Sequence, residues 1–241
     1  MNNLHVVLVA PRNPLNIGAA ARAMSNFGCS HLRLVNPYKV AFREARSAVG
    51  AGKLLAAARE YHSVHEAVAD CSLVAGTTAV RHRELQHPLR RLEVGARVIR
   101  RKLLSARVAL LFGPEKTGLS NEDLSHCHWL MHIPTRPEQV SMNLGQAVAV
   151  CLYELARDAN AKPERATTQP AVSAALDRIS DSLFDALQIS GYIKPKLTTP
   201  AELKIRRLVR RLNLTAEDAE TLLGMLRQIR WKLHSEGGQK P

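Results

Sequence analysis

Residues 108–156 read VALLFGPEKTGLSNEDLSHCHWLMHIPTRPEQVSMNLGQAVAVCLYELA. The apolar run Val108–Phe112 stops at a Gly-Pro pair, and a second apolar run, Trp129–Ile133, stops at a proline. A polar loop follows, and a helical pattern begins near Asn143. This order places the carboxyl ends of two strands next to the N-terminus of a helix. Because ligands bind in that kind of crevice in open α/β sheets, the stretch predicts a binding pocket.

The N-terminal region predicts the start of a parallel sheet. Leu4–Ala10 is continuous, apolar and rich in β-branched residues, which is typical of a buried strand. Ile17–Phe27 has a helical pattern that Asn16 can cap, and His31–Val35 predicts a second strand. A strand–helix–strand order favours an α/β fold in which helices cover both faces of a parallel sheet.

The next segments predict further helices and one more strand. The Ala-rich segment Arg43–His62 predicts a helix, Ser63–Asp70 a shorter helix and Ser72–Ala75 a strand. Arg81–Arg107 is the densest basic stretch of the chain. A block of one charge sign beside a strand end favours a phosphate-contacting surface over a solvated helix face.

The polar segment 159–170, ANAKPERATTQP, predicts a linker. It separates a domain of residues 1–158 from a small all-α domain of residues 171–241. Helical patterns cover Ala171–Leu187, Pro200–Leu212 and the region from Thr215 to about Leu233. The second of these helices is strongly basic.

Composition indicates a polyanionic partner. The chain has 241 residues, 46% of them hydrophobic, and a formal net charge of +13. Such a balance is the electrostatic footprint of a protein that binds nucleic acid.

The cysteines and histidines indicate neither disulfides nor a metal. The four cysteines are far apart in the sequence and form no CxxC pair, which favours a reducing cytoplasm. Alternation on a strand would direct His126 and His128 to one face and Cys127 to the other, so we expect no metal site there. The N-terminus lacks the basic region of a signal peptide, and no apolar run approaches the ~20 residues that span a bilayer, so no membrane partner is expected.

Three short polar clusters follow predicted strands. They are NIGAAAR at Asn16–Arg22, FGPEKTG at Phe112–Gly118, and the segment from Ile133 that ends in VSMNL at Leu144. Each alone has an ordinary explanation as a helix cap or a turn. Together, at the carboxyl ends of three strands, they predict one site.

These motifs, written NxGxxxR, FGPExxGL and IPxxxxxxSMNLxxAVAV, resemble the SPOUT superfamily of RNA methyltransferases, and within it the TrmH-like branch of 2′-O-ribose methyltransferases. The sequence LVNP at Leu34–Pro37 and the helical C-terminal region are most similar to the TrmJ group, which modifies nucleotide 32 of the tRNA anticodon loop. The resemblance covers residues 4–157 by motif and the remainder only by length and helical character.

The resemblance implies a fold, a cofactor and an oligomeric state. It implies a trefoil knot in the C-terminal part of the catalytic domain, a homodimer, and S-adenosylmethionine bound in a bent shape inside the knot. The cofactor loops would be formed by Thr77, Thr78, Ala79, Gly113, Ile133, Val140, Ser141 and Met142.

The resemblance also implies catalytic positions. The family's catalytic arginine falls on Arg22, with Asn16 beside it, and Glu115, Ser141 and Asn143 match its other polar site positions. The reaction would be 2′-O-methylation of cytidine or uridine in tRNA. From the basic segments we expect the following tRNA contacts: Arg81, Arg83, Arg90, Arg91, Lys204, Arg206, Arg207, Arg210 and Arg211.

Three alternatives stay open at this point. The chain could act on rRNA, or it could methylate a base nitrogen, as other branches of the superfamily do. It could also be a non-catalytic RNA-binding or ribosome-assembly factor that kept the fold and binds no cofactor.

Overall fold

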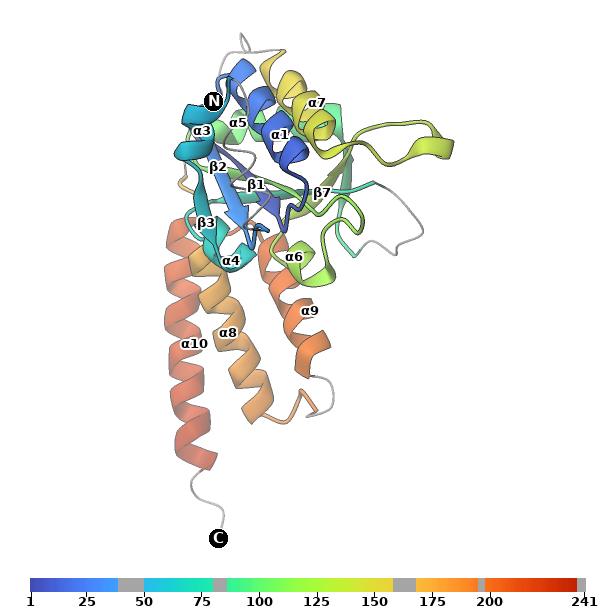
Figure 1. Ribbon diagram of the computed structural model, residues 1–241. Helices are drawn as coiled ribbons and strands as arrows, with labels where there is room; N and C mark the ends of the chain where they lie inside the picture. The colour runs from blue at the N-terminus through green and yellow to red at the C-terminus, as the bar shows by residue number, and fades with distance from the viewer. Residues whose placement is uncertain (39–49, 80–85, 158–167, 195–197, 238–241) are drawn as a thin grey trace.

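The computed structural model describes residues 1–38, 50–79, 86–157, 168–194 and 198–237. Its centre is a seven-stranded sheet of order β3-β2-β1-β6-β4-β7-β5, in which every neighbouring pair is parallel (Figure 1). The strands are β1 (Leu4–Val9), β2 (His31–Val35), β3 (Arg59–Tyr61), β4 (Leu73–Thr77), β5 (Leu89–Arg91), β6 (Val108–Phe112) and β7 (Trp129–His132). The predicted α/β fold with a parallel sheet is confirmed.

Helices cover both faces of the sheet. The first face packs against α1 (Pro14–Asn26), α3 (Gly52–Ala56), α5 (Leu92–Leu103) and α7 (Leu144–Ala156). The second face packs against α4 (Val64–Val68) and α6 (Asn121–Ser125). β1 and β6 are buried throughout, because strands in the middle of a parallel sheet have apolar layers on both sides.

Three C-terminal helices share a core of their own. They are α8 (Ser173–Ile189), α9 (Thr198–Arg211) and α10 (Ala216–Gly237), and buried aliphatic side chains such as Ile179, Ile205 and Leu223 join them. This helical part, drawn in orange and red in Figure 1, lies against α4 and α6. The backbone N–H and the hydroxyl of Ser173 both donate to the Cys71 carbonyl, at 2.8 Å each, and fix the start of α8 to the segment before β4.

Several local predictions differ from the structure. Asn13, not Asn16, caps α1, because Pro14 is well suited to the first helical turn and starts the helix three residues early. Residues 59–61 form the edge strand β3 although the Ala-rich pattern predicted a helix there, and β5 is a strand that no pattern indicated. Residues 43–49 of the predicted helix lie outside the described part of the chain.

The histidines before β7 do not alternate on a strand. His126 is the C-cap of α6, and β7 begins only at Trp129. His128 Nδ1 accepts a 3.1 Å hydrogen bond from the Val74 backbone N–H, and both histidines are buried. The strand argument against a metal is therefore wrong in its premise, and the expectation that no metal binds stays a prediction. No helix in the described ranges has the length and apolarity needed to cross a membrane.

Candidate active site

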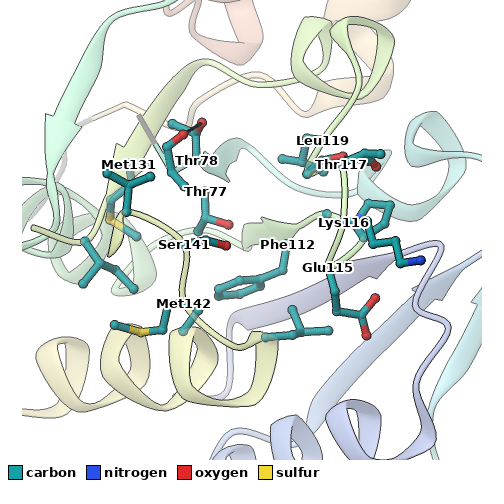
Figure 2. A pocket seen from close by; sticks show the side chains of 18 of the residues that line it. Thr77, Thr78, Phe112, Glu115, Lys116, Thr117, Leu119, Met131, Ser141 and Met142 are labelled. Atoms are coloured by element: carbon teal, nitrogen blue, oxygen red, sulfur yellow. Dashed lines mark hydrogen bonds between the residues drawn. The ribbon is translucent and has the colours of Figure 1, made fainter. Parts of the chain in front are cut away.

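A cavity of about 240 Å³ opens where β4, β6 and β7 end. Its walls come from the residues after β4, the loop after β6 and the segment that leads into α7 (Figure 2). The structure places all eight residues expected to form cofactor loops in this one cavity: Thr77, Thr78, Ala79, Gly113, Ile133, Val140, Ser141 and Met142.

The cavity combines apolar side chains with backbone groups. Phe112, Met131 and Leu144 contribute apolar surface, and in Figure 2 the Phe112 ring lies between Met142 and Glu115. Within the described residues, the backbone N–H groups of Ser141 and Met142 have no hydrogen-bond partner. The cavity can therefore pack a flat apolar group and still offer backbone donors to its edge.

The loop after β6 closes tightly on itself. A Cβ atom at Gly113 would lie 2.2 Å from the backbone nitrogen of Leu119, so only glycine fits there. Gly118 has a φ of +67°, a left-handed conformation that glycine adopts without strain. The two glycines let the loop fold back and place Glu115, Lys116 and Thr117 at the cavity wall.

One hydrogen-bonded chain joins the three sequence motifs. Asn16 Nδ2 donates to Glu115 Oε1 at 2.8 Å, and Asn143 Nδ2 donates to Asn16 Oδ1 at 2.7 Å. Asn143 also caps α7, as predicted, because its Oδ1 accepts from the backbone N–H groups of Gly145 and Gln146. Asn16 is only 8% exposed, so these amides hold one fixed arrangement.

Close packing of α1 on α7 supports this series of hydrogen bonds. A Cβ atom at Gly145 would lie 2.5 Å from the Cβ of Ala19, so the two helices approach closely at the point where Asn16 meets Asn143. Residues separated by more than a hundred positions thereby share one site at the carboxyl edge of the sheet.

Comparisons with known proteins agree with this geometry. The profile of the SpoU rRNA Methylase family matches residues 3–153. The chain belongs to this family. It is 36% identical to the tRNA (cytidine/uridine-2′-O-)-methyltransferase TrmJ of Yersinia pestis (strain Pestoides F) over 95% of this chain and 92% of that one. Identity to the TrmJ of Sodalis glossinidius (strain morsitans) is 35% over 100% of this chain and 94% of the relative.

A solved structure is similar over nearly the same range. The crystal structure of TrmJ from Z. mobilis ZM4 superposes with a TM-score of 0.82 at 33% identity, over 93% of this chain and 98% of that one. The similarity therefore extends beyond the family profile into the C-terminal helices, and the chain is a SpoU-family protein with this helical part attached.

Arg22 does not join the other predicted catalytic residues of this SpoU-family site. It is exposed on α1, two turns after Asn16, and does not line the cavity. Its side chain lies against Gly50, where a Cβ atom would be 2.9 Å from Nη1. The single protomer thus brings together Asn16, Glu115 and Asn143, with Ser141 at the cavity wall, and leaves Arg22 on the outer surface.

The residues predicted to contact RNA divide into three groups: two outside the described residues, two that already contact other side chains, and those on α9. Arg81 and Arg83 lie outside the described residues. The Arg90 guanidinium lies over the Trp129 ring, 5.0 Å from its centroid, and Arg91 pairs with Glu93 at 2.5 Å, so each already has a partner on the protein. Those partners do not remove them from the surface, and their RNA contacts stay predictions.

Helix α9 corrects one prediction. Arg210 is 0% exposed and therefore cannot contact RNA from this position. Its Nη2 donates to Asp177 Oδ1 at 2.8 Å, and its Nε donates to the His126 carbonyl at 2.7 Å. Arg206 is half-buried and donates to Ser125 Oγ at 3.0 Å and to Glu202 at 2.7 Å. The prediction rested on the basic character of the segment, which gave no sign that two of its arginines face α6.

The same junction holds a cluster of possible metal ligands. Donor atoms of His65, His126 and Asp177 lie within 4.8 Å of one another. Arg210 pairs with Asp177, and Arg206 and Arg210 each lie 3.4 Å from a His126 nitrogen, so two guanidinium charges already occupy the surroundings of this cluster. Burial first, and then the charges of Arg210 and Arg206, lower the pKa of His126 to about 2, which keeps its imidazole neutral.

Some residues that line the cavity were not among those predicted from the sequence. Thr135 and Leu144 belong to a stretch whose motif had been noted, so the pattern could have indicated them. Leu124 comes from α6, for which no helix was predicted, and only the packing of α6 on the sheet brings it to the cavity.

Proposed function

We propose that this protein transfers a methyl group from S-adenosylmethionine to a ribose 2′-hydroxyl of tRNA, at a cytidine or uridine of nucleotide 32 in the anticodon loop. The observation that carries the proposal is the cavity whose eight predicted loop residues meet beside the Asn16–Glu115–Asn143 chain. Support for the substrate comes from relatives named as tRNA (cytidine/uridine-2′-O-)-methyltransferases over nearly the full chain.

The cavity fits the proposed cofactor. Apolar walls at Phe112 and Met131 suit the faces of an adenine ring. The N–H groups of Ser141 and Met142, which no described residue accepts, suit its polar edge. The absence of an acidic or basic cofactor motif from the sequence agrees with recognition by backbone groups. Residues 113–119 and 133–142 would hold the molecule from two sides.

The remaining architectural features form part of the same proposal. We place a trefoil knot in the segment from β6 through α7, whose loops surround the cavity, and assign residues 1–158, 159–170 and 171–241 to a catalytic domain, a linker and a tRNA-binding helical domain. The separate cores of the sheet and of α8–α10 support this division. We also propose that the protein acts in the cytoplasm.

The position of Arg22 supports a homodimer. Arg22 is exposed on α1, which also exposes Leu15 (79%), and α7, which packs on α1, exposes Tyr153 (55%). Exposed apolar side chains on two packed helices suit a subunit interface. Pairing of two copies through α1 and α7 would bring Arg22 of one subunit to the cavity of the other.

In the proposed reaction the protein positions groups and stabilises charge. S-adenosylmethionine supplies an electrophilic methyl group, so the chain needs mainly to align the 2′-oxygen with it. Arginine has a pKa above ~12 and cannot readily accept a proton at pH 7. Arg22 would therefore orient the ribose or its phosphate and stabilise the developing alkoxide charge, and the hydroxyl proton would leave through Ser141 or water.

Incubation with labelled S-adenosylmethionine and separate pools of tRNA and rRNA tests the substrate. We expect label in tRNA only, at one anticodon-loop nucleotide that resists alkaline cleavage, because a 2′-O-methyl group removes the attacking hydroxyl. Label in rRNA or on a base nitrogen would replace the proposed substrate or the proposed atom. Absence of both transfer and calorimetric cofactor binding would favour a non-catalytic RNA-binding factor.

Substitution of Arg22 tests the catalytic assignment. Arg22→Ala should reduce transfer by about three orders of magnitude, a loss typical of removing a group that stabilises transition-state charge. Cofactor affinity should change little, because Arg22 does not line its own cavity. Near-normal turnover by this variant would exclude the role given to Arg22.

A further inference from the structure

Helix α9 carries two arginine pairs with opposite orientations. Arg206 and Arg210 are spaced four residues apart and face the protein, where they bond to Ser125, His126 and Asp177. These bonds fix the rotation of α9 about its axis. Arg207 follows Arg206 directly, and Arg211 follows Arg210. Each therefore lies about 100° further round the helix than the residue before it.

Arg207 and Arg211 lie one turn apart on the same side of α9. Both guanidinium charges act on the ring of His87, the residue two positions before β5. Burial lowers the pKa of His87 to about 4, with further lowering by Arg207 and Arg211, while a backbone hydrogen bond to Leu124 opposes the change.

These two charges lack the compensation found elsewhere in the helical part. Within the described ranges, neither Arg207 nor Arg211 has an acidic partner or a hydrogen bond, whereas Arg206, Arg210 and Arg230 each pair with a carboxylate. Burial and the charge of Arg211 lower the pKa of Arg207. Like charges four residues apart destabilise a helix, so an anion between them would relieve a repulsion.

We propose that Arg207 and Arg211 form a binding site for one or two backbone phosphates of the RNA substrate. The inference rests on the proposed function, because it takes tRNA as the partner. Two guanidinium groups one helical turn apart suit the multiple hydrogen bonds that phosphate oxygens accept. A phosphate held there is fixed relative to α6, since Arg206 and Arg210 bind α9 to the last residues of that helix.

The chain contains a matched control for this site. Arg97 and Arg101 of α5 are exposed and also four residues apart. They lie in the basic stretch 81–107 but are not among the tRNA contacts expected there, and α5 packs on the opposite face of the sheet from α6 and α9. The double variants Arg207→Gln/Arg211→Gln and Arg97→Gln/Arg101→Gln remove the same charge from the same kind of helix surface.

The experiment measures tRNA binding by fluorescence anisotropy at several salt concentrations, without cofactor. We expect the α9 variant to bind at least tenfold more weakly than wild type, and its log K against log salt slope to shrink by about one to two, because each lost phosphate contact removes about 0.9 from the slope. The α5 variant should lose less than threefold.

Equal losses in the two variants would overturn the proposal and indicate general electrostatic attraction. So would an unchanged salt slope in the α9 variant. Calorimetry with inorganic phosphate separates the sources: saturation of wild type at low millimolar phosphate, lost in the α9 variant while its tRNA affinity stays normal, would assign the pair to a free anion instead.

Methyl transfer to tRNA by the wild-type protein is measured in parallel. Transfer by wild type with no difference between the two variants would refute the phosphate site and leave the proposed function intact. A clear difference in binding between the variants with no transfer by wild type would support the site and refute the enzymatic assignment.

Discussion

The cofactor cavity and the junction between α6 and α9 are built in opposite ways. The cavity comes from loops that follow buried strands, and its polar contacts, such as Asn16 with Glu115, join neutral amides to a single carboxylate. The junction is built from side chains of packed helices, and Arg210 and Asp177 bury their charges there beside the neutral ring of His126. The first arrangement offers neutral groups to a ligand, whereas the second pairs buried charges with one another beside a second cavity of about 340 Å³.

This difference teaches where a sequence motif is informative. Loops at the carboxyl edge of a parallel sheet converge whatever the details of packing, so their residues can be assigned from strand ends alone. Helix-to-helix contacts depend on rotation and tilt, so whether a given arginine faces in or out is decided by its neighbours.

The largest expected effect is the loss of Arg210. Arg210→Met leaves the Asp177 carboxylate buried without its cation, which should lower the free energy of unfolding by about 3–5 kcal/mol. Chemical denaturation measures it, with Arg211→Met as the exposed control, for which we expect a change below about 0.5 kcal/mol. Similar small losses for both would mean that the junction is not held by charge.

The second expected effect concerns the chain of amides at the cavity. Asn16→Ala removes the bonds to Glu115 and Asn143 and should lower kcat/KM for tRNA about 100-fold, since small displacements at a site cost about that much. Asn13→Ala, on the same helix, removes only the N-cap bond to Leu15.

For the Asn13 variant we expect a loss of about 1 kcal/mol in stability and a normal rate. A comparable loss of rate in both variants would show that Asn16 acts only through the integrity of α1. Steady-state kinetics and thermal unfolding of the two proteins separate these outcomes.

The smallest effect is a pH dependence that belongs to the junction. The pKa of His126 is about 2 in the folded protein and ~6.5 in an unfolded chain, so the unfolded chain binds a proton that the native protein excludes. Stability from this group is complete above about pH 6.5 and falls by about 1.4 kcal/mol per unit as the pH decreases toward 2.

Between pH 6 and pH 4, the free energy of unfolding of His126→Asn should therefore decrease less steeply than that of wild type, by about 1.4 kcal/mol per pH unit. Denaturation at a series of pH values measures both slopes. Parallel curves for variant and wild type would mean that His126 is accessible to protons in the native protein.

Much of the fold followed from local patterns. His31–Val35 was predicted to the residue, and the cap at Asn143 was placed correctly, because an unbroken apolar run and a capping amide each have one dominant structural use. The short edge strands β3 and β5 were missed, since a three-residue segment rich in charged side chains forms a strand only when a neighbouring strand offers hydrogen bonds to pair with.

The sequence by itself determined the α/β class, the basic character and the three motifs that meet at the carboxyl edge of the sheet. Strand periodicity and loop chemistry are local, so they can be assigned without coordinates. The tertiary structure alone decided that Arg210 and Arg206 anchor α9, that Arg211 stays exposed, and that Arg22 lies away from its own cavity. Those outcomes depend on how helices far apart in the chain rotate against one another, which is a property of packing and not of any single segment.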